Sequence, residues 1–262
     1  MTPTDKTNKM LVSVVLDRSG SMGDVRAGTI SGYNEYINGL RKDTASEYSV
    51  SLIQFDAAGS AAGPTLTVSY IDKPLADVPV LTEQDYEPRG TTPLYDAIGE
   101  CVRRVEPKDR AVTILIITDG MENASREFTL DSVKALIQSK ESEGWTFAFL
   151  GADIDSYAVS GAMGMSAANT ANYAKSNVGA TYAAMAQSTM ARATLNATVG
   201  VGGASTMAFF DDDQKAAMGD PTVKGGQKPA PAGFPKKASV AGPNPGRPGR
   251  KPRNWVESPA KH

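Results

Sequence analysis

The chain has 262 residues, of which 27 are Lys or Arg and 29 are Asp or Glu, so its formal net charge is −2. It contains one cysteine, and its one histidine is the last residue, His262. These counts exclude an intramolecular disulfide and zinc sites built from several Cys and His ligands, and they argue against a Ser-His-Asp or Cys-His catalytic unit. Any site must therefore be built from carboxylates, hydroxyls, amides, lysines and arginines.

Predicted strands and helices alternate over most of the chain. Apolar runs rich in β-branched and aromatic residues predict strands over residues 11–16, 48–55, 65–71, 111–118 and 145–150. Apolar residues at helical spacing predict helices over residues 25–41, 94–105, 130–142, 155–162 and 178–195.

This alternation predicts an α/β fold with a doubly wound, mostly parallel central sheet flanked by helices, similar in architecture to a Rossmann fold. The strands at 11–16 and 111–118 are almost continuously apolar, as expected for strands that are buried on both faces. The strand at 65–71 follows the one at 48–55 with no helix between them, so we expect it to be antiparallel and to lie at an edge. One domain is expected over residues 10–195.

The rest of the chain differs in composition. Residues 196–213 form an extension for which the pattern predicts no element, and residues 214–262 are predicted to be a disordered, Gly- and Pro-rich tail. The tail holds ten Lys or Arg and two Asp or Glu, so its balance is +8 and that of residues 1–213 is −10. Residues 246–253 resemble an AT-hook only loosely. The stretch 236–253 could contact nucleic acid, another polyanion or the acidic body of the protein.

Nothing in the sequence indicates a membrane protein or an exported one. No apolar run of about 18 residues occurs, so no transmembrane helix is expected. The first ten residues are polar, and the apolar run that follows them is shorter than the core of a signal peptide. With a single cysteine, this predicts a cytoplasmic protein without membrane contact.

Candidate ligands gather where two predicted strands end. Asp17 follows the first strand and is followed by Ser19 and Ser21, and Asp119 follows the strand at 111–118. If these strands are neighbours where the strand order reverses, both carboxylates and several hydroxyls converge there. A set of oxygen ligands suits Mg²⁺ above all, with Mn²⁺ or Ca²⁺ as alternatives.

Three segments of the sequence resemble the von Willebrand factor type A domain. Residues 17–21 (DRSGS) match its D-x-S-x-S motif, which forms the metal-ion-dependent adhesion site. Residues 90–97 (GTTPLYDA) and 117–123 (ITDGMEN) are similar to its G-G-T-P-L-x-x-A and I-T-D-G-x-E-N segments, in the same order. The resemblance covers about residues 10–195. Within the family, the chain looks like the intracellular type found in bacteria and phages.

The resemblance implies that Ser19, Ser21 and Thr92 are hydroxyl ligands of the metal, with Asp17 and Asp119 close to the ion, often through water. One departure affects the threonine, because the family commonly has Gly-Gly before it whereas this chain has Gly90 and then two threonines; Thr91 is therefore a lesser possibility. Three neutral hydroxyls leave the cation under-neutralised, so a carboxylate from a protein partner would complete its coordination shell. This implies a non-enzymatic, Mg²⁺-dependent interaction module.

Other interpretations stay open at this stage. The Asp and Ser residues could simply cap a turn between strand and helix, and Asp17 could be the nucleophile of a Mg²⁺-dependent phosphohydrolase or phosphotransferase. A third possibility is a structural or assembly component. Asp56 has a minor chance of reaching the site, whereas Asp96 and Glu122 are expected to be solvated charges. Cys101 lies on an apolar helix face and is expected to be buried.

Overall fold

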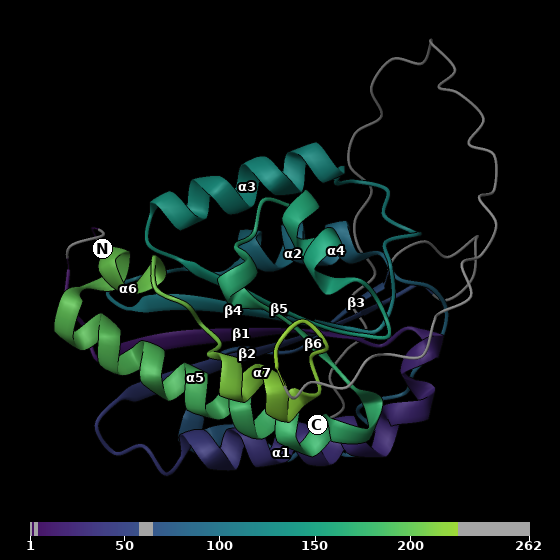
Figure 1. Ribbon diagram of the computed structural model, residues 1–262, viewed down its shortest axis with the longest axis horizontal. Coiled ribbons are helices and arrows are strands. Elements are labelled where there is room, and N and C mark those ends of the chain that lie inside the picture. Colours follow the sequence, from purple (N-terminus) through teal and green to yellow (C-terminus); the bar gives the residue numbers. More distant parts are fainter. Residues whose placement is uncertain (1, 3–4, 58–64, 225–262) are drawn as a thin grey trace.

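The protein forms a six-stranded sheet between two layers of helices, as the computed structural model shows for residues 2, 5–57 and 65–224 (Figure 1). The strand order is β3-β2-β1-β4-β5-β6. All neighbouring pairs are parallel except β2 and β3, and β3 lies at one edge. The predicted fold class and its antiparallel edge strand are therefore confirmed. The strands are β1 Lys9–Asp17, β2 Glu47–Asp56, β3 Thr65–Pro74, β4 Ala111–Thr118, β5 Thr146–Ala152 and β6 Thr170–Tyr173.

Helices cover both faces of the sheet. Figure 1 shows α2, α3 and α4 on one face, with α1, α5 and α7 on the other. The helices are α1 Arg26–Leu40, α2 Leu94–Arg104, α3 Leu130–Ser142, α4 Ser156–Ala162, α5 Val178–Val199, α6 Val201–Ser205 and α7 Asp212–Met218. Short 3₁₀ turns lie at η1 Gly20–Val25, η2 Leu75–Asp77, η3 Ala167–Asn169 and η4 Lys175–Asn177.

Strand β1 supplies side chains to both hydrophobic cores. Val12, Val14 and Leu16 pack in the core that also contains side chains of α1 and α5, whereas Leu11 and Val15 point to the other face, where α2 and α3 pack. All five are at most 1% exposed. Full burial of such side chains stabilises the fold by about 1.5–3 kcal/mol each, which explains why the apolar run at 11–16 could be recognised as a central strand.

The structure differs from the sequence-based boundaries near the end of the described chain. Residues 196–213 contain the last turn of α5 and all of α6, and α7 continues beyond residue 214, where the sequence predicts a disordered tail. Helix α7 begins with a capping box, in which Asp211 accepts from the backbone N–H of Gln214 and the Gln214 side chain accepts from that of Asp211. Buried Phe209, Phe210 and Met218 anchor this segment to the core. Residues 225–262, with the predicted polyanion-binding stretch, lie outside the described residues.

None of the helices in the described part of the chain combines the length and the apolar character that crossing a bilayer requires.

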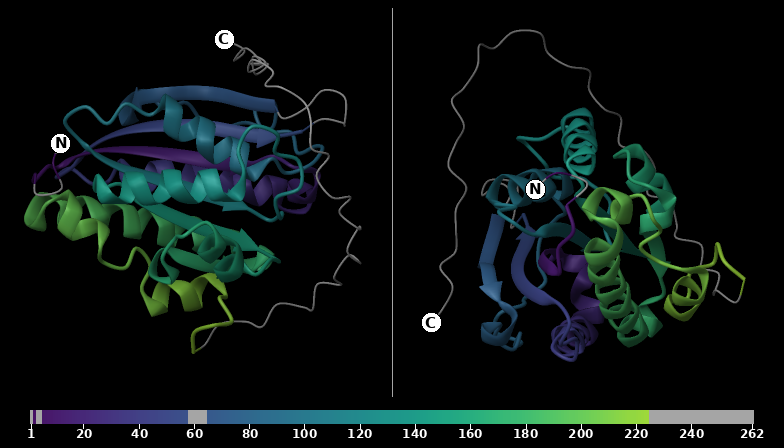
Figure 2. Two further views of the ribbon diagram at one scale, coloured as in Figure 1. Left: turned by 90° about the horizontal axis from the view of Figure 1, so that it is seen from above. Right: turned by 90° about the vertical axis from the view of Figure 1, so that its left-hand side faces the viewer.

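Helices α1 and α5 lie against each other, and Figure 2 shows the ribbon from two further sides. They pack closely because glycines of α1 face α5. A Cβ atom on Gly32 would lie 2.3 Å from the Tyr182 ring, and one on Gly28 would lie 3.4 Å from Val178. The missing side chains thus let the buried ring of Tyr182 sit against the α1 backbone.

Gly32→Ala should therefore destabilise the protein, although alanine is the better helix former. We expect a loss of about 1–3 kcal/mol in the free energy of unfolding from overpacking, measured by urea denaturation. Gly179→Ala is the matched control, because Gly179 is exposed on α5 and a Cβ there meets nothing within 4 Å. That variant should gain about 0.5–1 kcal/mol. Equal stability of the two variants would contradict the packing described here.

Candidate metal site

The candidate site lies where the order of the strands reverses. From β1 the chain continues to β2 on one side, and it later returns to β4 on the other side of β1. Asp17 ends β1 and Asp119 follows β4 directly, so both lie at the carboxyl edge of neighbouring parallel strands. This is the position at which open α/β sheets bind ligands.

Backbone hydrogen bonds join the three loops that carry the predicted ligands. Gly20 N donates to Gly90 O at 3.1 Å and Arg89 N donates to Arg18 O at 2.8 Å, which fixes the loop after β1 to the loop before α2. Gly90 has φ of 67°, a left-handed conformation that glycine adopts without strain. The loop after β4 is fixed to the same unit by Asn123.

Asn123 makes a two-way contact with Thr92. The backbone N–H of Asn123 donates to Thr92 O at 3.1 Å, and the Asn123 side-chain oxygen accepts from Thr92 N at 2.8 Å. The Thr92 hydroxyl then lies over Gly120, where a Cβ atom would be only 2.6 Å from Oγ1. A side chain at residue 120 would therefore displace this hydroxyl.

The side-chain oxygens of the predicted ligands lie close together. Ser19 Oγ is 3.2 Å from Ser21 Oγ, and Ser21 Oγ donates to Asp119 Oδ1 at 2.5 Å. Thr91 is directed differently, because its side chain is exposed and its hydroxyl faces Ala57 O at 3.4 Å, at the end of β2. Of the two threonines, Thr92 is the one that faces the loop of Asp119.

Asp17 is fully buried and joins the loop after β1 to the end of β4. Its Oδ1 accepts from Ser19 N at 2.6 Å, and its Oδ2 accepts from Thr118 Oγ1 at 2.5 Å. Burial raises the pKa of the Asp17 carboxyl to about 7, with a smaller increase from the nearby charge of Asp119, although the hydrogen bonds from Thr118 and Ser19 oppose the shift.

Asp119 forms an ion pair that the sequence did not suggest. Lys175 Nζ lies 2.9 Å from Asp119 Oδ2 and 3.3 Å from Asp153 Oδ2. Within the described residues, this buried oxygen of Asp119 has the ionic contact with Lys175 but accepts no hydrogen bond. Burial lowers the pKa of the Lys175 ammonium, but the carboxylates of Asp119 and Asp153 outweigh that effect and raise it above its usual value. Lys175 follows β6, a strand that was not predicted.

Asp56 supports the site from the end of β2. Its buried carboxylate accepts from Arg18 Nε at 2.7 Å and from Arg89 Nε at 3.2 Å. Arg18 also donates to Thr67 Oγ1 at 2.9 Å. Because Arg18 and Arg89 belong to two of the site loops, Asp56 joins these loops through one carboxylate oxygen.

Two other acidic residues are less solvated than the sequence predicted. Asp96 and Glu122 were expected to be solvated, but Asp96 is fully buried and accepts from three backbone N–H groups at 2.7–2.9 Å, those of residues 126–128. Glu122 accepts from the backbone N–H groups of Tyr95, Ala124 and Ser125 at 2.7–3.0 Å. Both carboxylates therefore fasten the loop after β4 to the start of α2. Cys101 is buried as expected, and burial raises the pKa of its thiol to about 12.

The donor set fits a hard cation. In an octahedral shell with oxygens about 2.1 Å from Mg²⁺, neighbouring oxygens are about 3.0 Å apart, and the Ser19 and Ser21 hydroxyl oxygens are 3.2 Å apart. Asp119 Oδ2 is a further oxygen that attracts positive charge, as its ion pair with Lys175 at 2.9 Å shows. Among the described residues, no group of three or more His, Cys, Asp or Glu could hold an ion, so any metal site here depends on hydroxyls as well as carboxylates.

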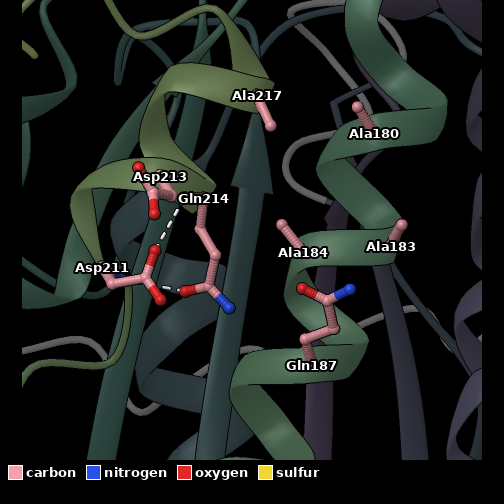
Figure 3. A pocket seen from close by; sticks show the side chains of 8 residues that line it. All are labelled: Ala180, Ala183, Ala184, Gln187, Asp211, Asp213, Gln214 and Ala217. Atoms are coloured by element: carbon pink, nitrogen blue, oxygen red, sulfur yellow. Dashed lines mark hydrogen bonds between the residues drawn. The ribbon is translucent and has the colours of Figure 1, made fainter. Parts of the chain in front are cut away.

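A pocket elsewhere on the molecule lacks such a donor set. It lies between α5 and α7, and Figure 3 shows alanines and polar side chains around it, with Asp211 and Gln214 joined by hydrogen bonds. Those two residues cap α7, so their polar atoms are already engaged. The convergence of ligand oxygens at the sheet edge has no counterpart in this pocket.

The known proteins that resemble this chain do so in fold. No model of a known family and no curated protein matches the sequence. The vWF domain of the type V pili tip protein Mfa5 from Porphyromonas gingivalis has a TM-score of 0.54 at 12% identity, over 74% of this chain and 97% of that one. Proximal thread matrix protein 1 from the mussel byssus has a TM-score of 0.53 at 12% identity, over 70% of this chain and 47% of that one. The pilus adhesin SpaC from Lactobacillus rhamnosus GG has a TM-score of 0.53 at 11% identity, over 71% of this chain and 31% of that one.

The chain therefore has the von Willebrand factor type A fold, as the three sequence segments predicted. It spans nearly the whole Mfa5 domain but only about half of the mussel protein and a third of the adhesin. At 11–12% identity the likeness establishes the fold alone.

The raised pKa of Asp17 predicts an unusual pH dependence for the metal-free protein. Because the folded state holds the proton up to about pH 7 while the unfolded state loses it near 3.8, the contribution to stability is complete below pH 3.8 and is lost as the pH rises to about 7. In EDTA, the free energy of unfolding of the wild type should fall across this window relative to that of Asp17→Asn, which carries no titrating carboxyl. If the free energies of unfolding of the two proteins, measured by urea denaturation, changed equally from pH 4 to pH 8, this prediction would be wrong.

Proposed function

We propose that the chain is a non-enzymatic module that binds a protein partner through a divalent cation, with Mg²⁺ as the preferred ion and Mn²⁺ or Ca²⁺ as alternatives. The observation that carries the proposal is the convergence of the Ser19 and Ser21 hydroxyls with Asp119 beside Thr92. The three hydroxyls would bind the ion directly. Asp17 and Asp119 would balance its charge, in part through water.

The charge around this site favours an acidic partner. Only two carboxylates face the ion in the proposed arrangement, and one of them, Asp119, already shares its charge with Lys175. Asp17 has a raised pKa, so burial makes its ionised form costly. A bound Mg²⁺ would supply a Lewis acid with an unfilled coordination position, and a carboxylate from another protein would both complete the shell and neutralise the charge.

The surface beside the site suits contact with a protein. Ser21 is exposed, and Met121, two residues beyond Asp119, is 62% exposed. An exposed methionine next to a polar centre gives a partner apolar area to cover. Among the proteins of similar fold, one is described as a pilus adhesin and another as a pili tip protein, which supports a binding role over a catalytic one.

The geometry does not favour the alternative of phosphoryl transfer from Asp17. A nucleophilic carboxylate needs an oxygen that can reach the substrate, but the Asp17 side chain is fully buried and both its oxygens accept hydrogen bonds. A role as a component of a larger assembly is compatible with the proposed module. The cytoplasmic location and the polyanion contact through residues 236–253 stay predictions.

Loss of one hydroxyl ligand should weaken metal binding without unfolding the protein. We expect Ser21→Ala to lower the affinity for Mg²⁺ at least about tenfold, which corresponds to 1.4 kcal/mol, while stability in EDTA changes by about 1 kcal/mol or less. Ser31→Ala is the matched control, because Ser31 is an exposed serine on α1 whose hydroxyl donates to Gly28 O within the same helix. Isothermal titration calorimetry measures both, and the same affinity in both variants would refute Ser21 as a ligand.

Partner binding should follow metal binding. In a pull-down from the native host, we expect a protein that the wild type and Ser31→Ala retain in Mg²⁺, and that EDTA or Ser21→Ala releases. Replacing the acidic residues of the retained protein one at a time by their amides should then abolish binding at a single position. Retention that is indifferent to EDTA would show that the interaction does not use the ion.

A further inference from the structure

The ammonium group of Lys175 lies against a residue assigned to the metal site. Its Nζ is 2.9 Å from Asp119 Oδ2 and 3.3 Å from Asp153 Oδ2. The side chain of Asp119 is fully buried, that of Lys175 is 25% exposed and that of Asp153 is 53% exposed. The lysine thus spans from the buried carboxylate to one at the surface.

The backbone around Lys175 is held in place by α7. Ala174 N donates to Met218 O at 2.9 Å, and Asn177 Nδ2 donates to Ala217 O at 3.2 Å. The turn η4, which begins at Lys175, is further fixed by the bond from Asn177 N to Ala174 O at 2.7 Å. Since the main chain is fixed on both sides, a change in the position of the ammonium would come from rotation of the flexible lysine side chain.

We propose that Lys175 is a built-in cation that competes with the divalent metal for Asp119 and so sets the metal affinity of the site. This inference rests on the proposed function. Ser21 donates to Oδ1 of the same carboxylate. An ion bound by the serine hydroxyls would therefore lie on one side of the Asp119 carboxylate, and the lysine ammonium would lie on the other. Their positive charges repel each other across the buried Asp119 carboxylate, where repulsion is stronger than in bulk water.

Asp153 gives the displaced ammonium a place to go. It already lies 3.3 Å from Nζ, so Lys175 can leave Asp119 and keep one carboxylate partner. The exchange would replace a monovalent tethered cation by a divalent one at Asp119. It follows that the wild-type site fills only when the concentration of the metal is high enough to displace the lysine.

A purely structural ion pair makes a different prediction. If Lys175 only stabilises the fold, its replacement lowers stability and leaves the metal affinity unchanged or weaker. If it competes with the metal, its replacement tightens metal binding even though the metal-free protein is less stable. Direct measurement of binding therefore separates the two roles.

The test is isothermal titration of Mg²⁺ into the full chain, with unfolding in EDTA measured in parallel. Lys175→Met keeps the length of the apolar stem without its charge, Lys175→Gln is a second neutral variant in case the first fails to fold, and Lys175→Arg keeps the charge. Lys140→Met is the matched control, because Lys140 is equally exposed at 26% and pairs with Glu143 at 2.8 Å, on α3.

We expect the neutral variants to bind Mg²⁺ about tenfold more tightly than the wild type, and Lys175→Arg and Lys140→Met to bind like the wild type. Binding by a neutral variant alone, with none by the wild type, would also support the inference. Equal affinity of the wild type and the neutral variants would overturn it while leaving the proposed function intact. No binding by any of the proteins would overturn the proposed function, and with it this inference.

Discussion

The buried carboxylate of Asp17 is the group on which the arrangement of the site depends. It ends a strand that is apolar on both faces, and its two oxygens join the loop after β1, through Ser19 N, to the end of β4, through Thr118. The main-chain oxygen of Asp17 accepts from the buried hydroxyl of Tyr86 at 2.7 Å, which ties a third segment to the same point. The cost of this position is desolvation, because burial raises the pKa of the Asp17 carboxyl although these hydrogen bonds oppose the shift. A nearby divalent cation would remove that cost, which links the fold of the switch point to the proposed ion.

The acidic residues around the site divide into two roles. Asp56 and Asp96 are fully buried and use their oxygens to hold loops, the former through Arg18 and Arg89 and the latter through backbone N–H groups. Asp119 instead faces the Ser21 hydroxyl with one oxygen and the Lys175 ammonium with the other. The loops are thus fixed by Asp56 and Asp96, so the groups proposed to bind the ion would be in position before it arrives.

The parts that the sequence predicted are those encoded by local pattern. Apolar runs identified β1 and β4, and the absence of a helix between β2 and β3 identified the antiparallel edge strand. Strand β6 was missed because its four residues (TANY) are neither alternating nor continuously apolar, and Lys175 was missed with it. Asp96 was misjudged because its partners, the N–H groups of residues 126–128, lie about thirty positions away in the sequence. Contacts of that kind depend on tertiary structure and leave no periodic signal.

A crystal structure of the full chain grown with Mn²⁺ tests the central claim most directly, because the anomalous scattering of the ion locates it without assumption. We expect one strong peak within about 2.3 Å of the hydroxyl oxygens of Ser19, Ser21 and Thr92, with the Lys175 ammonium turned from Asp119 to Asp153. A structure at saturating Mn²⁺ with no peak at this position, and with Lys175 still seated on Asp119, would contradict it.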